Sequence, residues 1–232
     1  QPRSRGLGDV YKRQERALYH ALYPARHALY SSDEFEGRDT GSEGQRKAVE
    51  YLREQYKIIG VEAGDPDQDY FQPMTLNFSP KRGLPSVDVE TENVIAIIKG
   101  SEIPDEYVII TSHLDHVGIE DGQIYNGADD DGSGTVAMLE MAEAFKLAEK
   151  EGKNPKRSIV FLHVSGEEKG LLGSRYYTDN DPIYPLKNTV VNLNLDMIGR
   201  IDPTREAKNR DYIYLIGTDP VSYTHLTLPT KA

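Results

Sequence analysis

Short apolar runs rich in β-branched residues alternate with helix-like segments along most of this chain. These runs are NVIAIIKG at 93–100, YVIITSHLD at 107–115, SIVFLHVSG at 158–166, TVVNLNLDMIG at 189–199 and DYIYLIG at 211–217. Because they are short and apolar, they are typical of buried strands. Strands that alternate with helices predict a three-layer α/β sandwich with a mixed, mostly parallel central sheet flanked by helices. The chain contains no internal repeat and no linker, so we expect a single domain.

Two segments carry apolar residues at helical spacing. In residues 40–60, Val49, Leu52 and Tyr56 fall on one helix face, and Gly60 stands where a C-terminal cap belongs. Residues 132–150 show a similar apolar spacing and predict a second helix. Between the first helix and the first apolar run, residues 65–86 are polar and contain prolines, which is typical of a loop or an edge strand.

The two ends of the chain differ from its body. GLGDVYKRQ near the start and VSYTHLTLPT near the end resemble translated sequencing-adapter sequence. We therefore expect residues 1–14 and 220–232 to be non-native. Residues 15–219 then form the single native domain, which is expected to be incomplete at its C-terminus.

Overall composition excludes several classes of protein. A net charge of −11 argues against nucleic-acid binding, which needs clustered Lys and Arg. No apolar run is long enough to span a bilayer, so no membrane span is expected. The absence of cysteine excludes disulfides and thiolate zinc sites.

Potential metal ligands follow the apolar runs at the points where strands are expected to end. His113 follows one run, Glu167 and Glu168 follow another, and Asp196 follows a third. In open α/β sheets, ligands bind outside the carboxyl ends of the strands. A further acidic segment, NGADDDGSG at 126–134, opens the second helix, where exposed backbone amides stabilise a carboxylate.

Each of these features has an ordinary structural explanation when it stands alone. His113 could be a hydrogen-bonded histidine, the acidic segment a helix cap, and the Glu pair a charged loop tip. The acidic segment is contiguous, so it does not fit a calcium loop, which needs alternate positions. Asp196 ends an apolar run and is therefore expected to be paired, capped or bound to a metal. The coincidence of all four features in one α/β unit predicts a metal site.

The ligand types indicate which metal is bound. One histidine with several carboxylates and no cysteine suits zinc, with manganese or cobalt as substitutes. More ligands are available than a single catalytic zinc needs. This surplus favours two metal ions about 3.5–4 Å apart that share a carboxylate.

The four motifs, in this order, resemble those of the co-catalytic dizinc aminopeptidases, which include aminopeptidase Y and bacterial secreted leucyl aminopeptidases. HxD after a strand, NGADDDGSG, SGEEKGLLGS and NLDMIGR carry the resemblance, which extends over about residues 30–217. It implies a zinc exopeptidase fold and an aminopeptidase that removes N-terminal residues from peptides. It also implies export from a bacterial cell.

The resemblance also implies a role for each matching residue. Asp129 would bridge two zinc ions, His113 and Asp196 would bind one of them, and Glu168 the other. Glu167 would be the general base, and the carboxylate of Asp115 would hydrogen-bond the outer ring nitrogen of His113. The peptide bond between Asp129 and Asp130 would be cis.

Some features depart from the family pattern. The family's second zinc takes a further histidine from a segment well past Asp196. Here the only histidine after His163 is His225, which lies in the adapter-like tail and is not assigned as a ligand. His116 is expected to be buried or to support the ligands, and His163 to be a hydrogen-bonded core residue.

Three other functions remain open from the sequence. A carboxypeptidase and a one-zinc glutaminyl cyclase belong to the same wider group of zinc hydrolases. A non-catalytic binding homologue would keep the fold, but it would not need Glu167. The substrate side-chain preference and the oligomeric state do not follow from these residues.

Overall fold

The computed structural model describes residues 23–65, 67–80, 83–202, 204, 212–216 and 224–227. Residues 1–14, expected to be non-native, lie outside the described residues, as does most of 220–232. A six-stranded sheet runs through the molecule in the order β1-β3-β7-β4-β8, with β2 also paired to β3. Its strands are β1 (Glu62–Ala63), β2 (Phe71–Phe78), β3 (Val87–Ile98), β4 (Ile103–His113), β7 (Arg157–Val164) and β8 (Thr189–Asn194).

The sheet is mixed, as expected, but only part of it is parallel. Strands β7, β4 and β8 are parallel, whereas β3 pairs antiparallel with β1, β2 and β7. The expectation of a mostly parallel sheet is therefore wrong for the half that contains β3. Only residues 99–102 join β3 to β4. This link is too short for the crossover that parallel strands need, so β4 runs opposite to β3.

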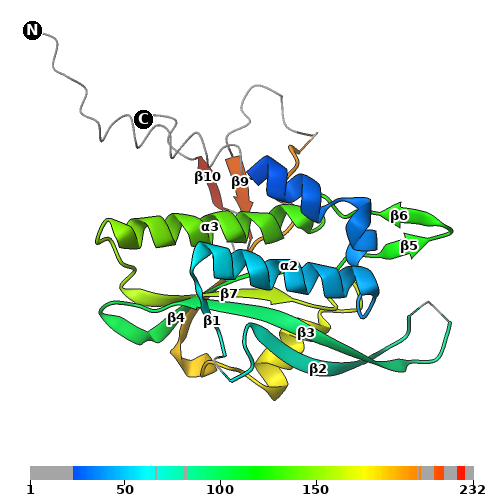
Figure 1. The fold of residues 1–232 in the computed structure, drawn as a ribbon, viewed down its shortest axis with the longest axis horizontal. Helices are drawn as coiled ribbons and strands as arrows, with labels where there is room; N and C mark the ends of the chain where they lie inside the picture. Colours follow the sequence, from blue (N-terminus) through cyan, green and yellow to red (C-terminus); the bar gives the residue numbers. More distant parts are fainter. Residues whose placement is uncertain are drawn as a thin grey trace, which may run out of the picture.

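Helices cover both faces of the sheet and make the three layers that the sequence predicts (Figure 1). On one face lie α2 (Glu43–Ile59) and α3 (Gly132–Lys150), packed over Val94, Ala96 and Phe161. On the other face lie α4 (Leu172–Arg175) and the π-helical turn η2 (Tyr176–Asn180). A second core cluster there joins strand residues to Tyr177. The short 3-10 helix η3 (Leu186–Asn188) leads into β8.

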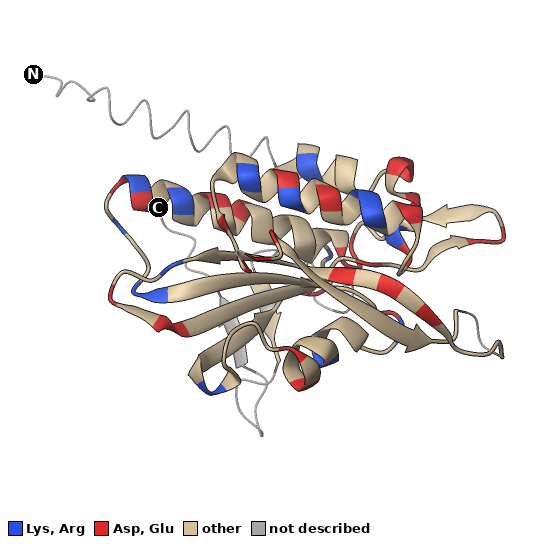
Figure 2. Ribbon diagram, turned by 60° about the horizontal axis from the view of Figure 1, so that its bottom comes forward, with Lys and Arg blue, Asp and Glu red and all other residues tan. Residues whose placement is uncertain are grey.

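Helix α2 ends where the sequence predicts, but it begins at Glu43, a few residues after the expected start at residue 40. The Ser42 hydroxyl accepts a hydrogen bond from the Gln45 amide at its start, and Gly60 adopts a left-handed conformation (φ 84°) at its end. Val49, Leu52 and Tyr56 are buried, as predicted. Charged side chains occupy the outward surface, and blue and red bands alternate along the helices in Figure 2. The burial pattern is therefore that of an amphipathic surface helix.

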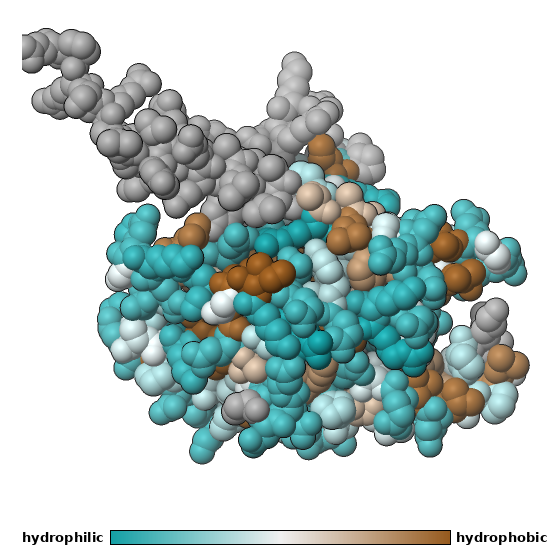
Figure 3. Space-filling view, in the orientation of Figure 1, coloured by the Kyte–Doolittle hydropathy of each residue, from teal (hydrophilic) through white to brown (hydrophobic). Residues whose placement is uncertain are grey.

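Before α2, a helical segment at 23–30 leads into the 3-10 element η1 (Asp33–Arg38). The hairpin of β5 (Gly118–Glu120) and β6 (Gln123–Tyr125) lies beside η1 at one end of the molecule (Figure 1). On the face drawn in Figure 3, hydrophilic surface separates small apolar patches. No helix among the described residues is long and apolar enough to cross a membrane.

The C-terminal part of the described chain departs from expectation. Strand β8 lies at the edge of the sheet, and most of its residues are exposed. Asp196, which follows β8, is exposed too, so burial does not force it to be paired. Residues 211–217 do contain a strand, β9 (Tyr212–Leu215). However, β9 pairs with β10 (Thr224–Thr227) in a separate two-stranded sheet.

Candidate metal centre

The parallel strands bring their carboxyl ends to one edge of the sheet. In the register of β4, His113 lies opposite Val164 of β7, and Thr111 lies opposite Asn194 of β8. The Glu167–Glu168 turn and Asp196 follow these two strands within a few residues. The sheet therefore collects the strand-end residues at one edge, as the sequence predicts.

The acidic segment before α3 adds a further carboxylate, but it is not the predicted one. Asp130 Oδ1 lies 2.9 Å from His113 Nε2. The neighbouring Asp129 turns away: its Oδ1 accepts from the Gly199 amide at 2.8 Å, and its Oδ2 lies 2.7 Å from Arg200 Nε. The structure thus brings Asp130 rather than Asp129 to His113. The cis peptide bond lies between Asp130 and Asp131, one residue later than expected.

Asp131, the third acid of this segment, caps the helix instead of facing the other ligands. Its Oδ1 accepts a hydrogen bond from the Gly134 amide at 2.9 Å at the start of α3. Asp131 is buried, and this burial raises the pKa of its carboxyl to about 8. The three consecutive acids therefore have three different surroundings.

Two groups of potential ligand atoms share the Asp130 carboxylate. His113, Asp130 and Asp196 form one group, and His116, Asp130 and Glu168 form the other. Within each group, the ligand atoms lie within 4.8 Å of one another. Imidazole and carboxylate donors in such groups suit zinc, manganese or cobalt.

The carboxylates around His113 create an excess of negative charge that a bound cation would balance. Burial alone lowers the pKa of His113, but the surrounding carboxylates, Asp115 first among them, outweigh burial and raise it to about 10. Partial removal of water from around the carboxyl of Asp196, an exposed residue, also raises its pKa, and the neighbouring carboxylates raise it further. Contact with His116, 2.8 Å from Glu168 Oε1, lowers the pKa of Glu168. The site holds more carboxylates than imidazoles, and a divalent cation fits this excess of negative charge.

The Asp115 carboxylate contacts the Glu167–Glu168 turn more closely than it contacts the His113 ring. Its buried carboxylate accepts from the Glu167 amide at 3.1 Å and from the Thr40 hydroxyl at 3.0 Å. His113 Nδ1 donates instead to the backbone carbonyl of Asp115 at 2.9 Å, and the carboxylate is 3.8 Å away. The expected carboxylate contact is therefore replaced by a carbonyl, which equally leaves Nε2 free to bind a metal.

Glu167 belongs to neither ligand group. Its side chain lines a cavity of about 210 Å³ together with His113 and Asp196. Burial raises the pKa of Glu167, and the nearby Glu168 and Asp115 raise it further. A carboxylate so placed can exchange a proton with a molecule held in this cavity.

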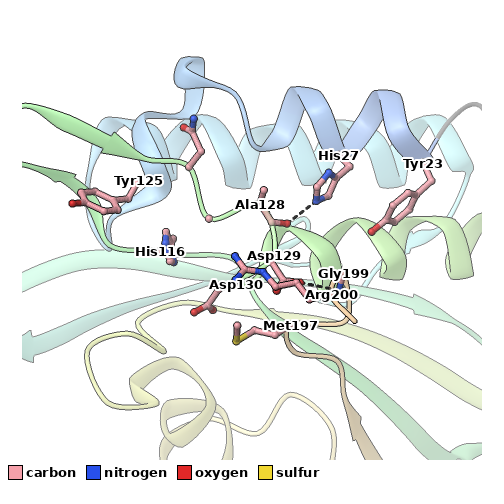
Figure 4. A pocket seen from close by; sticks show the side chains of 12 residues that line it. Tyr23, His27, His116, Tyr125, Ala128, Asp129, Asp130, Met197, Gly199 and Arg200 are labelled. Carbon is pink, nitrogen blue, oxygen red and sulfur yellow. Dashed lines mark hydrogen bonds and ion pairs between the residues drawn. The ribbon is translucent and has the colours of Figure 1, made fainter. Parts of the chain in front are cut away.

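A larger hollow of about 580 Å³ is lined by Asp130 and His116 among others. Figure 4 shows Asp130 and His116 at its base, with Tyr125 to one side and Tyr23 and His27 to the other. Arg200 lies beside Asp129 in the same view. His113 and Asp196 of one ligand group thus line the smaller cavity, and His116 and Asp130 of the other line the larger hollow.

Sequence reasoning missed three contributors to this site. Asp130 could not be distinguished from Asp129 within a contiguous acidic run. Thr40 gave no signal, because its contact with Asp115 joins segments far apart in the chain. His116 was assigned a supporting role, and its spacing from His113 was the signal that could have placed it in a ligand group.

Comparison with known proteins agrees with this geometry. Residues 93–215 match the sequence model of peptidase family M28. Aminopeptidase YwaD of Bacillus subtilis (strain 168) is 40% identical over 111 residues, which cover 47% of this chain and 22% of that protein. An Arabidopsis thaliana protein named probable glutamate carboxypeptidase is 34% identical over 111 residues, 48% of this chain and 15% of that protein.

Solved structures share the fold. A Zn-dependent exopeptidase from Parabacteroides distasonis superimposes with a TM-score of 0.58 and 20% identity, over 78% of this chain and 62% of that one. The chain therefore spans less than a quarter of the two curated relatives and about three fifths of this structural neighbour.

Proposed function

Since this chain belongs to peptidase family M28, we propose that it is the catalytic part of a zinc-dependent aminopeptidase. Its substrate is a peptide with a free N-terminus, from which it removes the first residue. The observation that carries this proposal is the pair of ligand groups that share the Asp130 carboxylate. Such a pair suits two co-catalytic metal ions.

The metal ligands follow from this geometry. His113, Asp130 and Asp196 would hold one zinc ion, and Asp130 and Glu168 would hold the other. Asp130, the residue common to both groups, would thus have the role that the sequence resemblance gave to Asp129. His116 is the imidazole within reach of the second position in the described part of the chain.

The remaining residues supply the proton transfers. Zinc held at these positions would supply a Lewis acid for the scissile carbonyl and for a water that is nucleophilic at neutral pH. Glu167 accepts the proton of the attacking water and passes it to the departing amine, because its carboxylate faces the cavity shared with His113 and Asp196. Asp115 fixes the Glu167–Glu168 turn through its amides, so that one glutamate faces the metal and the other faces the cavity.

Paired variants of the two adjacent glutamates test this assignment. Glu168→Gln removes a ligand and is expected to lower the zinc content per chain. Glu167→Gln is expected to keep both zinc ions and to lower kcat by about 100-fold or more. Zinc content is measured by atomic spectroscopy, and kcat by release of an aminoacyl chromophore with and without chelator.

The matched control is Glu102→Gln, an exposed glutamate paired with Lys156 near the opposite end of β4. It is expected to change neither zinc content nor turnover. Near wild-type turnover by Glu167→Gln contradicts the role of Glu167. Activity that survives chelation contradicts the metal mechanism.

The same assays separate the alternatives. One zinc per chain, with cyclisation of N-terminal glutamine, favours a glutaminyl cyclase. Release of C-terminal residues favours a carboxypeptidase, the class named for the Arabidopsis relative. Zinc binding without turnover of any of these substrates favours a binding homologue. The YwaD relative supports the aminopeptidase among these. Export from a bacterial cell stays a prediction.

A further inference from the structure

Arg38 is a fully buried cation directly behind the candidate metal centre. Its side chain is 0% exposed and stacks on the Tyr30 ring, with Cζ 4.5 Å from the ring centroid. All four of its hydrogen bonds within the described part of the chain go to backbone carbonyls and none to a carboxylate. Burying a charged side chain costs free energy unless hydrogen bonds compensate for the lost water. The four backbone carbonyls provide that compensation for Arg38.

The carbonyls that Arg38 binds belong to the two segments that carry metal ligands. Nε donates at 3.1 Å to Leu114, the residue after His113. On the other side, Nη1 donates at 2.8 Å to Asn126 and Nη2 donates at 2.9 Å to Gly127, in the turn that leads to Asp130. One guanidinium therefore ties the end of β4 to the acidic segment.

Backbone contacts around Arg38 also hold the end of β4 and the acidic segment together. Arg38 has φ 54°, a left-handed conformation that residues with side chains seldom adopt. Its own carbonyl accepts a hydrogen bond from the His116 amide at 3.2 Å. Gly127 leaves no room for a side chain, since an added Cβ would lie 2.7 Å from Arg38 Nη2. The packing around the guanidinium is thus close on the side of the acidic segment.

Only arginine can make this set of contacts. Its guanidinium has donors that diverge in a fixed plane, so it can reach carbonyls on two sides at once. Its charge also acts on Asp115, Asp130 and Asp131, which interact with it electrostatically. A lysine would keep the charge but not the divergent donors.

We propose that Arg38 is a positioning residue for the metal centre. It fixes His113 and Asp130 at coordinating separation, and its buried charge offsets the repulsion among the carboxylates before a cation binds. This inference rests on the proposed function, since it assumes that these residues bind metal.

The test measures metal affinity in Arg38→Met and Arg38→Lys variants of the full chain. Arg38→Met is expected to weaken zinc binding by about 10–100-fold, the usual effect of losing a group that orients ligands. Arg38→Lys is expected to fall between Arg38→Met and the wild type. Zinc affinity is measured by competition with a chromophoric chelator. The visible spectrum of the Co²⁺ form reports coordination geometry, which is expected to change in Arg38→Met.

Arg26→Met is the matched control. Arg26 is also buried, but it binds Glu140 and Glu143 on α3, away from the ligands. It is expected to lower stability without changing zinc affinity or the Co²⁺ spectrum. If Arg38→Met does not fold, Arg38→Lys carries the test through the same two measurements.

Two results overturn the inference. One is an Arg38 variant, Met or Lys, with wild-type zinc affinity and Co²⁺ spectrum; the other is Arg26→Met weakening zinc as much as Arg38→Met. A wild-type chain that binds no zinc would instead contradict the proposed function itself, so the two failures are distinguishable.

Discussion

His163 shows how a single residue can combine a chemically reactive group with a purely structural role. It is fully buried in β7, with Nε2 2.7 Å from the Tyr56 hydroxyl and Nδ1 3.1 Å from the Ser112 hydroxyl. This matches the expectation of a hydrogen-bonded core histidine. Burial lowers the pKa of its imidazole to about 3, so the ring is neutral in the folded protein.

A pH dependence of stability follows from this residue. Between about pH 6.5 and 3 the unfolded chain binds a proton at His163 that the folded chain does not, so the free energy of unfolding decreases as the pH falls. We expect this residue to contribute a slope of about 1.4 kcal/mol per pH unit. His163→Gln should remove that slope in urea titrations at several pH values. His27→Gln, at a partly exposed site, should retain it, and equal slopes in the wild type and His163→Gln would contradict the prediction.

At the scale of elements, α2 owes its place to one apolar face. Leu52 is 0% exposed against the sheet, whereas Ile58 on the same helix is 74% exposed. Leu52 and Ile58 are similar in size and differ mainly in how far each side chain is buried.

Truncation of each side chain should separate burial from helix propensity. Leu52→Ala leaves a cavity and is expected to cost about 2–5 kcal/mol of unfolding free energy. Ile58→Ala is expected to stay within about 0.5 kcal/mol of the wild type. Urea denaturation of both variants gives the comparison. Similar losses at the two positions would mean that α2 does not pack by this face.

At the scale of the whole molecule, the proposed metal centre joins segments from four parts of the chain. Its ligands come from the end of β4, the start of α3, the turn after β7 and the segment after β8. A metal that binds these ligands together only in the folded state must stabilise that state.

Zinc should therefore raise the thermal unfolding midpoint of the wild type. At a free zinc concentration about 100 times the Kd, the expected gain is about 2.7 kcal/mol. Calorimetry with added zinc and with chelator measures it. Glu168→Gln should show a smaller gain, whereas Glu102→Gln should match the wild type. An unchanged midpoint with zinc would count against metal binding by the folded chain.

The sequence by itself determined the kinds of residue at the site and the edge of the sheet where they meet. Apolar runs define strands, and polar residues directly after them must lie at strand ends, so His113, Glu167, Glu168 and Asp196 were predictable as neighbours. The end of α2 was predictable too, because Gly60 caps it through local backbone contacts.

Only the tertiary structure decided which member of each local set faces the site. Adjacent side chains leave the backbone in different directions, and a contiguous acidic run does not show which of Asp129, Asp130 and Asp131 meets His113. The partners of the Asp115 carboxylate, the Glu167 amide and Thr40, come from distant segments. The direction of β3, the edge position of β8 and the burial of Arg38 likewise depend on packing between elements, which local residue patterns do not contain.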